Sequence, residues 1–125
     1  MSETITLTTG IYDLIKDQIR RKRVSKEVED LLTEELKTAK QVIRKELPAD
    51  VVSVGKRVTV KDHSTNKEQQ YLFVSPDKAK ISKGKYSVMS DVALAVIGRK
   101  EGDVVQWVFK DGEKKLEVIK VEDGE

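Results

Sequence analysis

The sequence predicts an α+β fold: an N-terminal antiparallel helical hairpin, forming a short coiled coil, followed by an antiparallel β-sheet domain with one short helix. Three observations predict it. Apolar residues recur at helical spacing early in the chain, they alternate with polar or basic residues in short runs further on, and Pro48 stands between the two patterns. We therefore assign residues 1–48 to the hairpin and residues 49–125 to the sheet domain.

The composition limits the classes of function. The 125 residues include no cysteine and one histidine, which excludes a disulfide framework, a thiol nucleophile, a zinc cluster and a histidine-based metal site. The formal net charge is +2, from 24 Lys and Arg against 22 Asp and Glu, and this balance does not require nucleic acid as a partner. Because neither a signal-peptide pattern nor a membrane-spanning apolar run is present, we expect a cytoplasmic protein with no membrane partner.

The first helix is predicted from Gly10 to about Arg21. Its apolar residues describe one stripe of an amphipathic helix, made of Ile11, Leu14, Ile15 and Ile19. Residues 1–9 are polar and β-branched, and we predict a frayed lead-in within which Thr8 or Thr9 caps the helix.

The second helix is predicted from Ser25, its N-cap, to Leu47, where Pro48 stops it. Glu27 and Glu29 lie in its first turns, where the helix dipole favours negative charge. Two amphipathic helices joined by a few residues form an antiparallel hairpin, because neither can bury its apolar stripe alone.

Short alternating runs predict the strands of the second domain, at residues 57–61, 68–74, 86–89, 104–109 and 115–121. Asp111 and Gly112 are a strong type I′ turn signal between the last two strands. Residues 78–85 are predicted to form a basic loop with Ile81 as its apolar anchor.

The stretch from Lys85 to Asp103 is predicted to hold a buried helix between two strands, with Ser90 as its cap and Gly98 as its stop. Five residues of this stretch are expected in the core, namely Val88, Val92, Ala95, Val96 and Ile97. Trp107 and Tyr86 are expected in the core too, or else to stack on a base or a proline ring.

The basic cluster, Arg20, Arg21, Lys22 and Arg23, is predicted to lie at the tip of the hairpin. Cations at a helix C-terminus complement the helix dipole and keep a connecting turn solvated. Four adjacent cations exceed what capping needs, so contact with phosphates or with an acidic protein surface is the alternative interpretation.

Two groups of polar residues have the chemistry of a metal or catalytic site but not its geometry. Glu27, Glu29 and Asp30 have the oxygen ligands that a divalent cation prefers, yet the neighbouring cations favour a salt-bridged surface, and we predict no metal site. His63 has aspartate and serine beside it in a polar turn, but adjacent turn residues do not converge as a catalytic triad must.

The segments VSPDKA and GKYSVMSDVALAVIGRKEGD, placed after a helical hairpin, resemble the bacterial transcript-cleavage factors GreA and GreB and especially their relative Rnk. The resemblance covers nearly the whole chain. Ten residues match the signature, namely Gly84, Lys85, Ser87, Val88, Ser90, Ala95, Gly98, Lys100, Gly102 and Asp103. The interdomain junction of Rnk is matched by Pro48, Asp50, Val51 and Val52.

This resemblance implies a C-terminal domain of the FKBP-like fold that docks on RNA polymerase at the rim of its secondary channel, with the hairpin pointing toward the channel. The resemblance also implies a contrast with the cleavage factors, in which acidic residues at the hairpin tip help to hold a catalytic magnesium ion in the polymerase active site, as two-metal catalysis requires. The candidate polymerase-binding residues that it implies here are Met89, Ser90 and Asp91, with Pro76 and Asp77 beside them.

The sequence departs from the cleavage factors in three ways. Its basic tip would repel a magnesium ion, its hairpin is short, and Asp91 and Ala93 stand where the family usually has proline and glycine. We therefore expect a regulator of the Rnk-like branch that binds RNA polymerase without stimulating cleavage and is itself neither an enzyme nor dependent on a cofactor.

Three alternatives stay open. The first is a true cleavage factor that uses Glu27, Glu29 or Asp30 as metal ligands. The second is an FKBP-like peptidyl-prolyl isomerase, although its pocket should be rich in aromatic residues and the six in this chain are spread over both halves. The third is weak or indirect nucleic-acid binding through the basic cluster.

Overall fold

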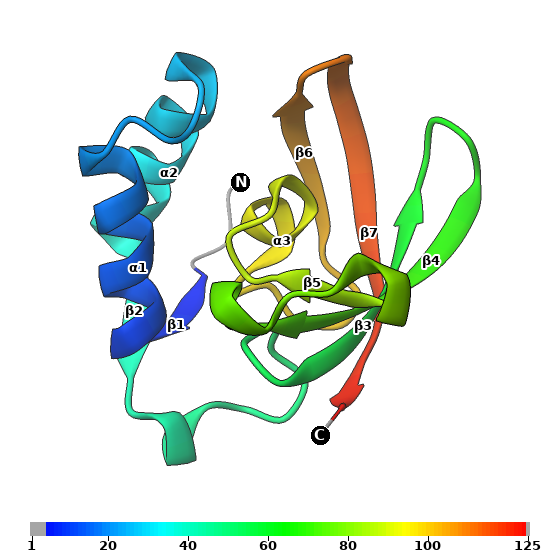
Figure 1. Ribbon diagram of the computed structural model, residues 1–125, viewed down its shortest axis with the longest axis horizontal. Helices are drawn as coiled ribbons and strands as arrows, with labels where there is room; N and C mark the ends of the chain where they lie inside the picture. Colours follow the sequence, from blue (N-terminus) through cyan, green and yellow to red (C-terminus); the bar gives the residue numbers. More distant parts are fainter. Residues whose placement is uncertain (1–4, 125) are drawn as a thin grey trace. The chain divides into compact units, whose positions relative to one another are not determined.

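The computed structural model describes residues 5–124, and the chain divides into two compact units on either side of the Leu47–Pro48 bond (Figure 1). The N-terminal unit contains two helices and a two-stranded sheet, and the C-terminal unit contains a five-stranded sheet and a short helix. This mixture of helices and a multistranded sheet confirms the predicted α+β class.

The two helices of the N-terminal unit begin at the predicted caps. Helix α1 (Thr9–Arg20) follows Thr8, whose hydroxyl accepts a hydrogen bond from the Ile11 amide at 3.3 Å. Helix α2 (Lys26–Thr38) follows Ser25, whose hydroxyl accepts one from the Val28 amide at 3.3 Å. Each cap satisfies a backbone donor that the first helical turn leaves without a partner, which fixes where the helix starts.

The two helices run in opposite directions. The Tyr12 hydroxyl, in the first turns of α1, donates to the Leu36 carbonyl in the last turn of α2 at 3.5 Å. The most buried side chains of the two helices are Ile11, Ile15 and Leu32. Ile11 and Ile15 are four residues apart on one helical face, as an amphipathic stripe requires.

The predicted second helix is too long, because α2 ends at Thr38 and Ala39 already has an extended backbone. Strand β2 (Lys40–Val42) follows and pairs in parallel with β1 (Thr6–Thr8). Pairing of the β2 backbone with β1 therefore takes the place of the last turns of the predicted second helix. A short 3₁₀ turn at residues 44–46 then leads to Pro48.

The prediction of a frayed lead-in is wrong for residues 5–9, and residues 1–4 lie outside the described part of the chain. Residues 6–8 form β1, and Ile5 and Leu7 are buried. Alternation along an extended strand places Ile5 and Leu7 on the same side, which explains why a mostly polar segment is ordered.

The five-stranded sheet of the C-terminal unit has the strand order β5–β4–β3–β7–β6. Its strands are β3 (Lys56–Asp62), β4 (Lys67–Val74), β5 (Lys85–Ser87), β6 (Val104–Phe109) and β7 (Gly112–Asp123). Three neighbouring pairs are antiparallel, but β4 and β5 are parallel, so the prediction of an entirely antiparallel sheet is wrong. A parallel pair needs a crossover connection, which residues 75–84 supply.

The bounds of β6 agree with the prediction, but its turn does not. Phe109 pairs with Gly112, which leaves a two-residue loop of Lys110 and Asp111. A type I′ turn requires positive φ at both loop residues. Among the described residues, positive φ outside glycine occurs only at Lys22 and Asn66, while Gly112 itself has φ 120°.

The core of the C-terminal unit lies under the sheet and the short helix α3 (Asp91–Val96). Of the five predicted core residues of the signature stretch, Val88, Ala95, Val96 and Ile97 are buried, whereas Val92 is half-buried at a pocket described below. Trp107 is 2% exposed, which confirms its interpretation as a core residue.

The connector after Pro48 is integrated into the C-terminal unit. Val51 and Val52 are buried, and the Val52 amide donates to the Arg99 carbonyl at 2.8 Å. The Val52 carbonyl accepts from the Gly98 amide at 3.0 Å, immediately after α3. The first residues of the C-terminal unit are therefore hydrogen-bonded to the segment that follows α3.

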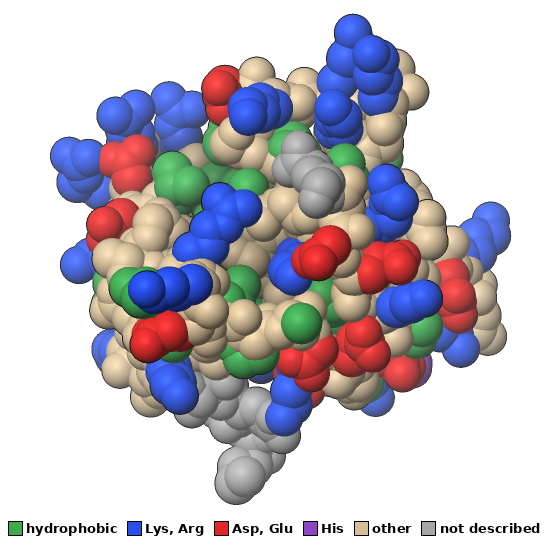
Figure 2. Space-filling model, turned by 90° about the horizontal axis from the view of Figure 1, so that it is seen from below, with side chains coloured by type: hydrophobic (Ala, Val, Ile, Leu, Met, Phe, Trp, Pro, Cys, Tyr) green, Lys and Arg blue, Asp and Glu red, His purple; other side chains and the backbone are tan. Residues whose placement is uncertain are grey.

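Charged side chains cover much of the face drawn in Figure 2, and hydrophobic side chains appear there only in small patches. This surface follows from a chain in which 37% of the residues are charged. None of the described helices has the length and the apolar composition needed to span a lipid bilayer.

Candidate functional site

The five residues predicted to bind a partner are brought to one end of the sheet. Val74 of β4 pairs with Ser87 of β5, and the Val88 amide donates to the Val74 carbonyl at 2.8 Å. Since the two strands are parallel, residues 76–77 and 89–91 both follow the carboxyl end of a strand. The structure thus gathers two stretches that the sequence separates into one docking patch, which we define as Pro76, Asp77, Met89, Ser90 and Asp91.

The docking patch has an ordered backbone and exposed carboxylates. The Met89 amide donates to the Ser87 hydroxyl at 3.0 Å, and the Ser90 amide donates to the Ser87 carbonyl at 2.9 Å. Pro76, Asp77 and Asp91 are exposed, whereas Met89 and Ser90 are half-buried. Such a patch can offer acidic groups beside apolar ones without first having to order its backbone.

Ser90 occupies the N-cap position of α3, as predicted, but its hydroxyl makes no capping hydrogen bond. Its Oγ is buried and has no hydrogen-bond partner among residues 5–124. A buried hydroxyl without a partner costs free energy, so the expected stabilisation from this cap is absent.

Three of the four cations of the basic cluster are paired with neighbouring carboxylates. Asp17 is paired with both Arg20 and Arg21, the latter at 3.1 Å, and hydrogen bonding by Arg20 is the main cause of the lowered pKa of Asp17. Lys22 lies 3.2 Å from Glu29. Among the described residues, Arg23 is the member of the cluster without an ion pair.

Two of the three candidate carboxylates after the turn, Glu29 and Asp30, are paired with cations as well. Glu29 accepts from Lys22 at 3.2 Å and lies 3.6 Å from Lys26, and Lys26 also lies 3.2 Å from Asp30. The pair with Asp30 is the first cause of the raised pKa of Lys26. Among residues 5–124, no three acidic or histidine side chains are grouped so that they could hold a metal ion.

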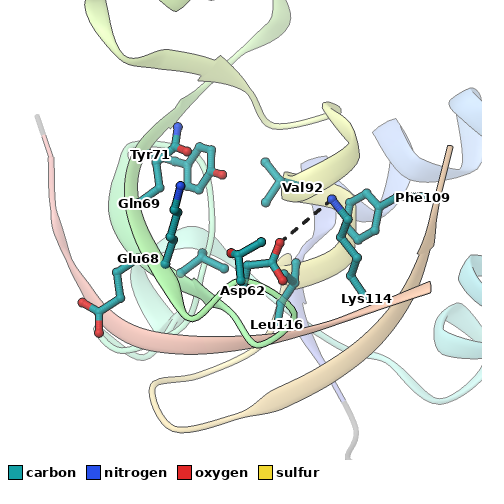
Figure 3. Close-up of a pocket in the computed structure, with 11 residues that line it drawn as sticks. Asp62, Glu68, Gln69, Tyr71, Val92, Phe109, Lys114 and Leu116 are labelled. Atoms are coloured by element: carbon teal, nitrogen blue, oxygen red, sulfur yellow. Dashed lines mark ion pairs between the residues drawn. The ribbon is translucent and has the colours of Figure 1, made fainter. Parts of the chain in front are cut away.

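A pocket of about 320 Å³ opens in the C-terminal unit (Figure 3), and the sequence analysis did not predict it. Side chains from β3, β4, α3, β6 and β7 form it. Its apolar walls are Val60, Tyr71, Val92, Phe109 and Leu116. No local pattern in the sequence could reveal this pocket, because its walls come from five elements that meet only in the folded sheet.

The charged mouth of the pocket centres on Asp62 and Lys114, whose side chains lie 3.9 Å apart (Figure 3). The Asp62 carboxylate accepts from the Ser64 amide at 2.9 Å and from the Ser64 hydroxyl at 2.6 Å. These hydrogen bonds are the main cause of the lowered pKa of Asp62, and Lys114 and His63 contribute further. Lys114 also pairs with Asp111 at 3.1 Å, so its ammonium lies between two carboxylates.

Aromatic residues are more concentrated than the sequence analysis expected. Five of the six lie in the C-terminal unit, and Tyr71 packs against Phe73 at 5.6 Å and against Tyr86 at 4.8 Å between ring centroids. Burial is the first cause of the raised pKa of Tyr71, so its phenol is neutral at pH 7. Two of these aromatic residues, Tyr71 and Phe109, line the pocket.

His63 does not join a catalytic triad. Its Nε2 lies 2.9 Å from a Glu117 carboxylate oxygen, while the Ser64 hydroxyl donates to Asp62 rather than to the imidazole. A triad requires the hydroxyl to donate to the histidine.

Comparison with known proteins gives the family. A family model described as "Transcription elongation factor, GreA/GreB, C-term" matches residues 47–123, which is more than half of the chain. Transcription elongation factor GreA of Clostridium botulinum (strain Eklund 17B / Type B) is 35% identical over 129 residues, covering 99% of this chain and 81% of that protein. GreA of Clostridium beijerinckii is 40% identical over 84 residues, covering 67% of this chain and 52% of that protein.

Solved structures share the fold. A prokaryotic transcription elongation factor GreA/GreB from Nitrosomonas europaea superposes with a TM-score of 0.68 at 23% identity, covering 97% of this chain and 99% of that one. Gfh1 of Thermus aquaticus superposes with a TM-score of 0.52 at 19% identity, with the same coverage. With the family model and the GreA relatives, these likenesses lead to one conclusion: the chain belongs to the GreA/GreB family of transcription elongation factors.

Proposed function

We propose that the chain binds RNA polymerase through its C-terminal unit and regulates elongation at the secondary channel without stimulating transcript cleavage. In this proposal the C-terminal unit has the FKBP-like fold and the α1–α2 helix pair is a short coiled coil directed toward the channel, as in the Rnk-like branch. Membership of an elongation-factor family supports binding to the polymerase, and the preordered docking patch supplies a surface for it.

One observation carries the non-cleaving part of the proposal. Two of the three candidate carboxylates beside the turn of the helix pair are bound to cations, Glu29 to Lys22 and Lys26 and Asp30 to Lys26, which leaves Glu27 as the one without an ion pair among residues 5–124. A magnesium ion held jointly with a polymerase active site needs carboxylate oxygens free to coordinate it. The short arm supports the same view, because the 13 residues of α2 extend only about 20 Å.

Binding to core RNA polymerase is the direct test. Immobilised wild-type protein should retain core polymerase, and the double variant Ser90→Arg with Asp91→Arg should retain at least tenfold less, because it places two bulky side chains at the docking patch and removes the Asp91 carboxylate. Lys110→Glu, on the exposed β6–β7 loop, is the control for a surface charge change elsewhere and should bind as wild type does. If wild type does not bind, polymerase binding is wrong. If the double variant binds as well as wild type, the docking patch is misplaced.

Transcript cleavage separates this proposal from a true cleavage factor. Stalled, backtracked elongation complexes should keep their RNA length when the protein is added. RNA shortening that is abolished by Glu27→Ala or Asp30→Ala would overturn the non-cleaving part, since both side chains are exposed near the turn.

A peptidyl-prolyl isomerase is the second candidate, because the pocket has Tyr71 and Phe109 among its walls. Such a pocket can take a proline ring against aromatic faces. A proline-isomerisation assay decides this: we expect no rate above background. A rate above background that Tyr71→Ala and Phe109→Ala both remove would establish the isomerase instead.

Nucleic-acid binding through the basic cluster is the third candidate, and exposed Arg23 is the observation in its favour. Binding through phosphates would weaken steeply as salt is added. We expect a gel shift with RNA, if seen at all, to be unchanged when the four cluster residues are replaced by alanine. A shift that is lost in this variant would instead assign nucleic-acid binding to the cluster.

A further inference from the structure

Ile81 is the most exposed of the large hydrophobic side chains in residues 5–124, at 71%, which corrects its prediction as a buried anchor. It lies in the crossover between β4 and β5, within the segment Lys78–Lys83, which we call the lysine loop. A single exposed aliphatic side chain is common on protein surfaces and needs no explanation by itself. Ile81 differs from such an ordinary exposed side chain in its backbone hydrogen bonds and in the charges around it.

The backbone holds Ile81 in a fixed place. Lys80 and Lys85 exchange two backbone hydrogen bonds, at 2.8 and 3.1 Å, and so close the base of the turn that carries Ile81. Inside the turn, the Gly84 amide donates to the Ile81 carbonyl at 2.9 Å, and Gly84 has a left-handed backbone with φ 72°. Because the backbone of the turn is already ordered, binding at Ile81 does not have to order it, and less of the free energy of burial is lost to entropy.

The lysine loop also differs from the basic cluster in its charges. Lys78, Lys80 and Lys83 are all exposed, and none of them makes an ion pair within the described part of the chain. In the basic cluster, by contrast, three of four cations are paired with carboxylates. Cations that repel one another in the free protein are positioned to steer an acidic partner toward the loop.

The lysine loop adjoins the docking patch. Leu72 pairs with Lys85 and Val74 with Ser87, so the turn carrying Ile81 and the docking patch lie at opposite ends of a three-residue strand. At about 3.3 Å per residue, that separation is on the order of 10 Å. An interface of standard size buries about 800 Å² on each partner and would span both.

We propose that the polymerase-docking surface extends from the docking patch onto the lysine loop, where Ile81 enters an apolar recess within an acidic region of the polymerase surface. This rests on the proposed function and adds the chemistry of the contact. The combination favours a protein partner over nucleic acid, because phosphates would use the lysines but leave Ile81 exposed to water.

The test is a binding titration of the full-length chain against core RNA polymerase. Ile81→Asp should weaken binding at least tenfold, and the triple variant Lys78→Glu, Lys80→Glu and Lys83→Glu at least as much. The matched controls are Ile43→Asp, at a side chain that is 51% exposed, and Lys110→Glu; both should stay within twofold of wild type. Circular dichroism melting curves establish that each variant is folded.

The outcomes separate the inference from the proposed function. If wild type binds and Ile81→Asp stays within twofold, the lysine loop is not part of the interface, although polymerase binding stands. If wild type does not bind, both the proposed polymerase binding and the role of the lysine loop are wrong. A parallel titration with a fluorescent single-stranded RNA identifies the other source of affinity: if the triple variant loses RNA binding while Ile81→Asp keeps its affinity for polymerase, the loop is a phosphate site and the inference is overturned.

Discussion

Among single residues, Asp62 at the mouth of the pocket keeps its charge through hydrogen bonds from Ser64 and through the nearby Lys114 ammonium. Its pKa is lowered below the usual 3.8, so its contribution to stability is present at neutral pH and is lost as the pH falls through the lowered pKa. We expect Asp62→Asn to be less stable than wild type at pH 7, with a difference that shrinks toward pH 2. Urea unfolding across this range measures it, and a difference independent of pH would contradict the assignment.

Trp107 is a second residue whose replacement has a definite consequence. It is 2% exposed on β6, whereas Val104 on the same strand is 46% exposed. Trp107→Ala should lower the free energy of unfolding by about 3–5 kcal/mol, because a large buried side chain is replaced by a cavity. Val104→Ala is the matched control, with an expected change within about 0.5 kcal/mol. Urea unfolding followed by circular dichroism compares the two, and equal losses would show that burial does not govern this strand.

At the scale of elements, β1 holds the two ends of the N-terminal unit together. Leu7 is 1% exposed within this strand. Leu7→Ala should therefore cost about 2–5 kcal/mol of unfolding free energy, while Gln41→Ala, at its exposed partner in β2, should change it by less than about 0.5 kcal/mol. The helical signal in circular dichroism measures both. A Leu7 variant as stable as wild type would mean that the burial of this side chain does not stabilise the unit.

The helix starts could be predicted from the sequence, and the end of α2 could not. Thr8 and Ser25 act on amides three residues away, so their role is visible locally. After Thr38 the apolar residues continue at helical spacing, but β2 pairs with β1 instead. These two strands are separated in the sequence by both helices. No local window contains that partner. The parallel pairing of β4 with β5 was missed for the same reason.

For the candidate site, too, some features could be predicted from the sequence and others depend on long-range pairing. The residues of the docking patch could be identified from the signature, but their convergence depends on the parallel pairing of Val74 with Ser87. The pairing of Asp17 with Arg20 and Arg21 follows from helical spacing, whereas the approach of Lys22 to Glu29 depends on the positive φ of Lys22 in the turn. The ion pairs of the basic cluster could therefore be predicted only in part from the sequence.

At the scale of the whole molecule, the two compact units predict a separation of roles. Residues 48–125 contain the docking patch, the lysine loop and a buried core that includes Trp107. We expect this fragment to fold cooperatively, to bind core polymerase within about threefold of the full chain, and to lose the effect on elongation that depends on the helix pair. Tryptophan fluorescence during urea unfolding and a binding titration test it. A fragment that folds but does not bind would place essential contacts in residues 1–47.

The pairing of β1 with β2 has a consequence for synthesis on the ribosome. Chains emerge from the N-terminus at about 5–20 residues per second, so β1 appears well before the strand that completes it. Until residues 40–42 emerge, both α1 and α2 have been made while the backbone of residues 6–8 lacks its partner. Strand β1 is thus among the last parts of its unit to gain its backbone partner, and a nascent chain stalled within α2 would expose Ile5 and Leu7 to chaperones.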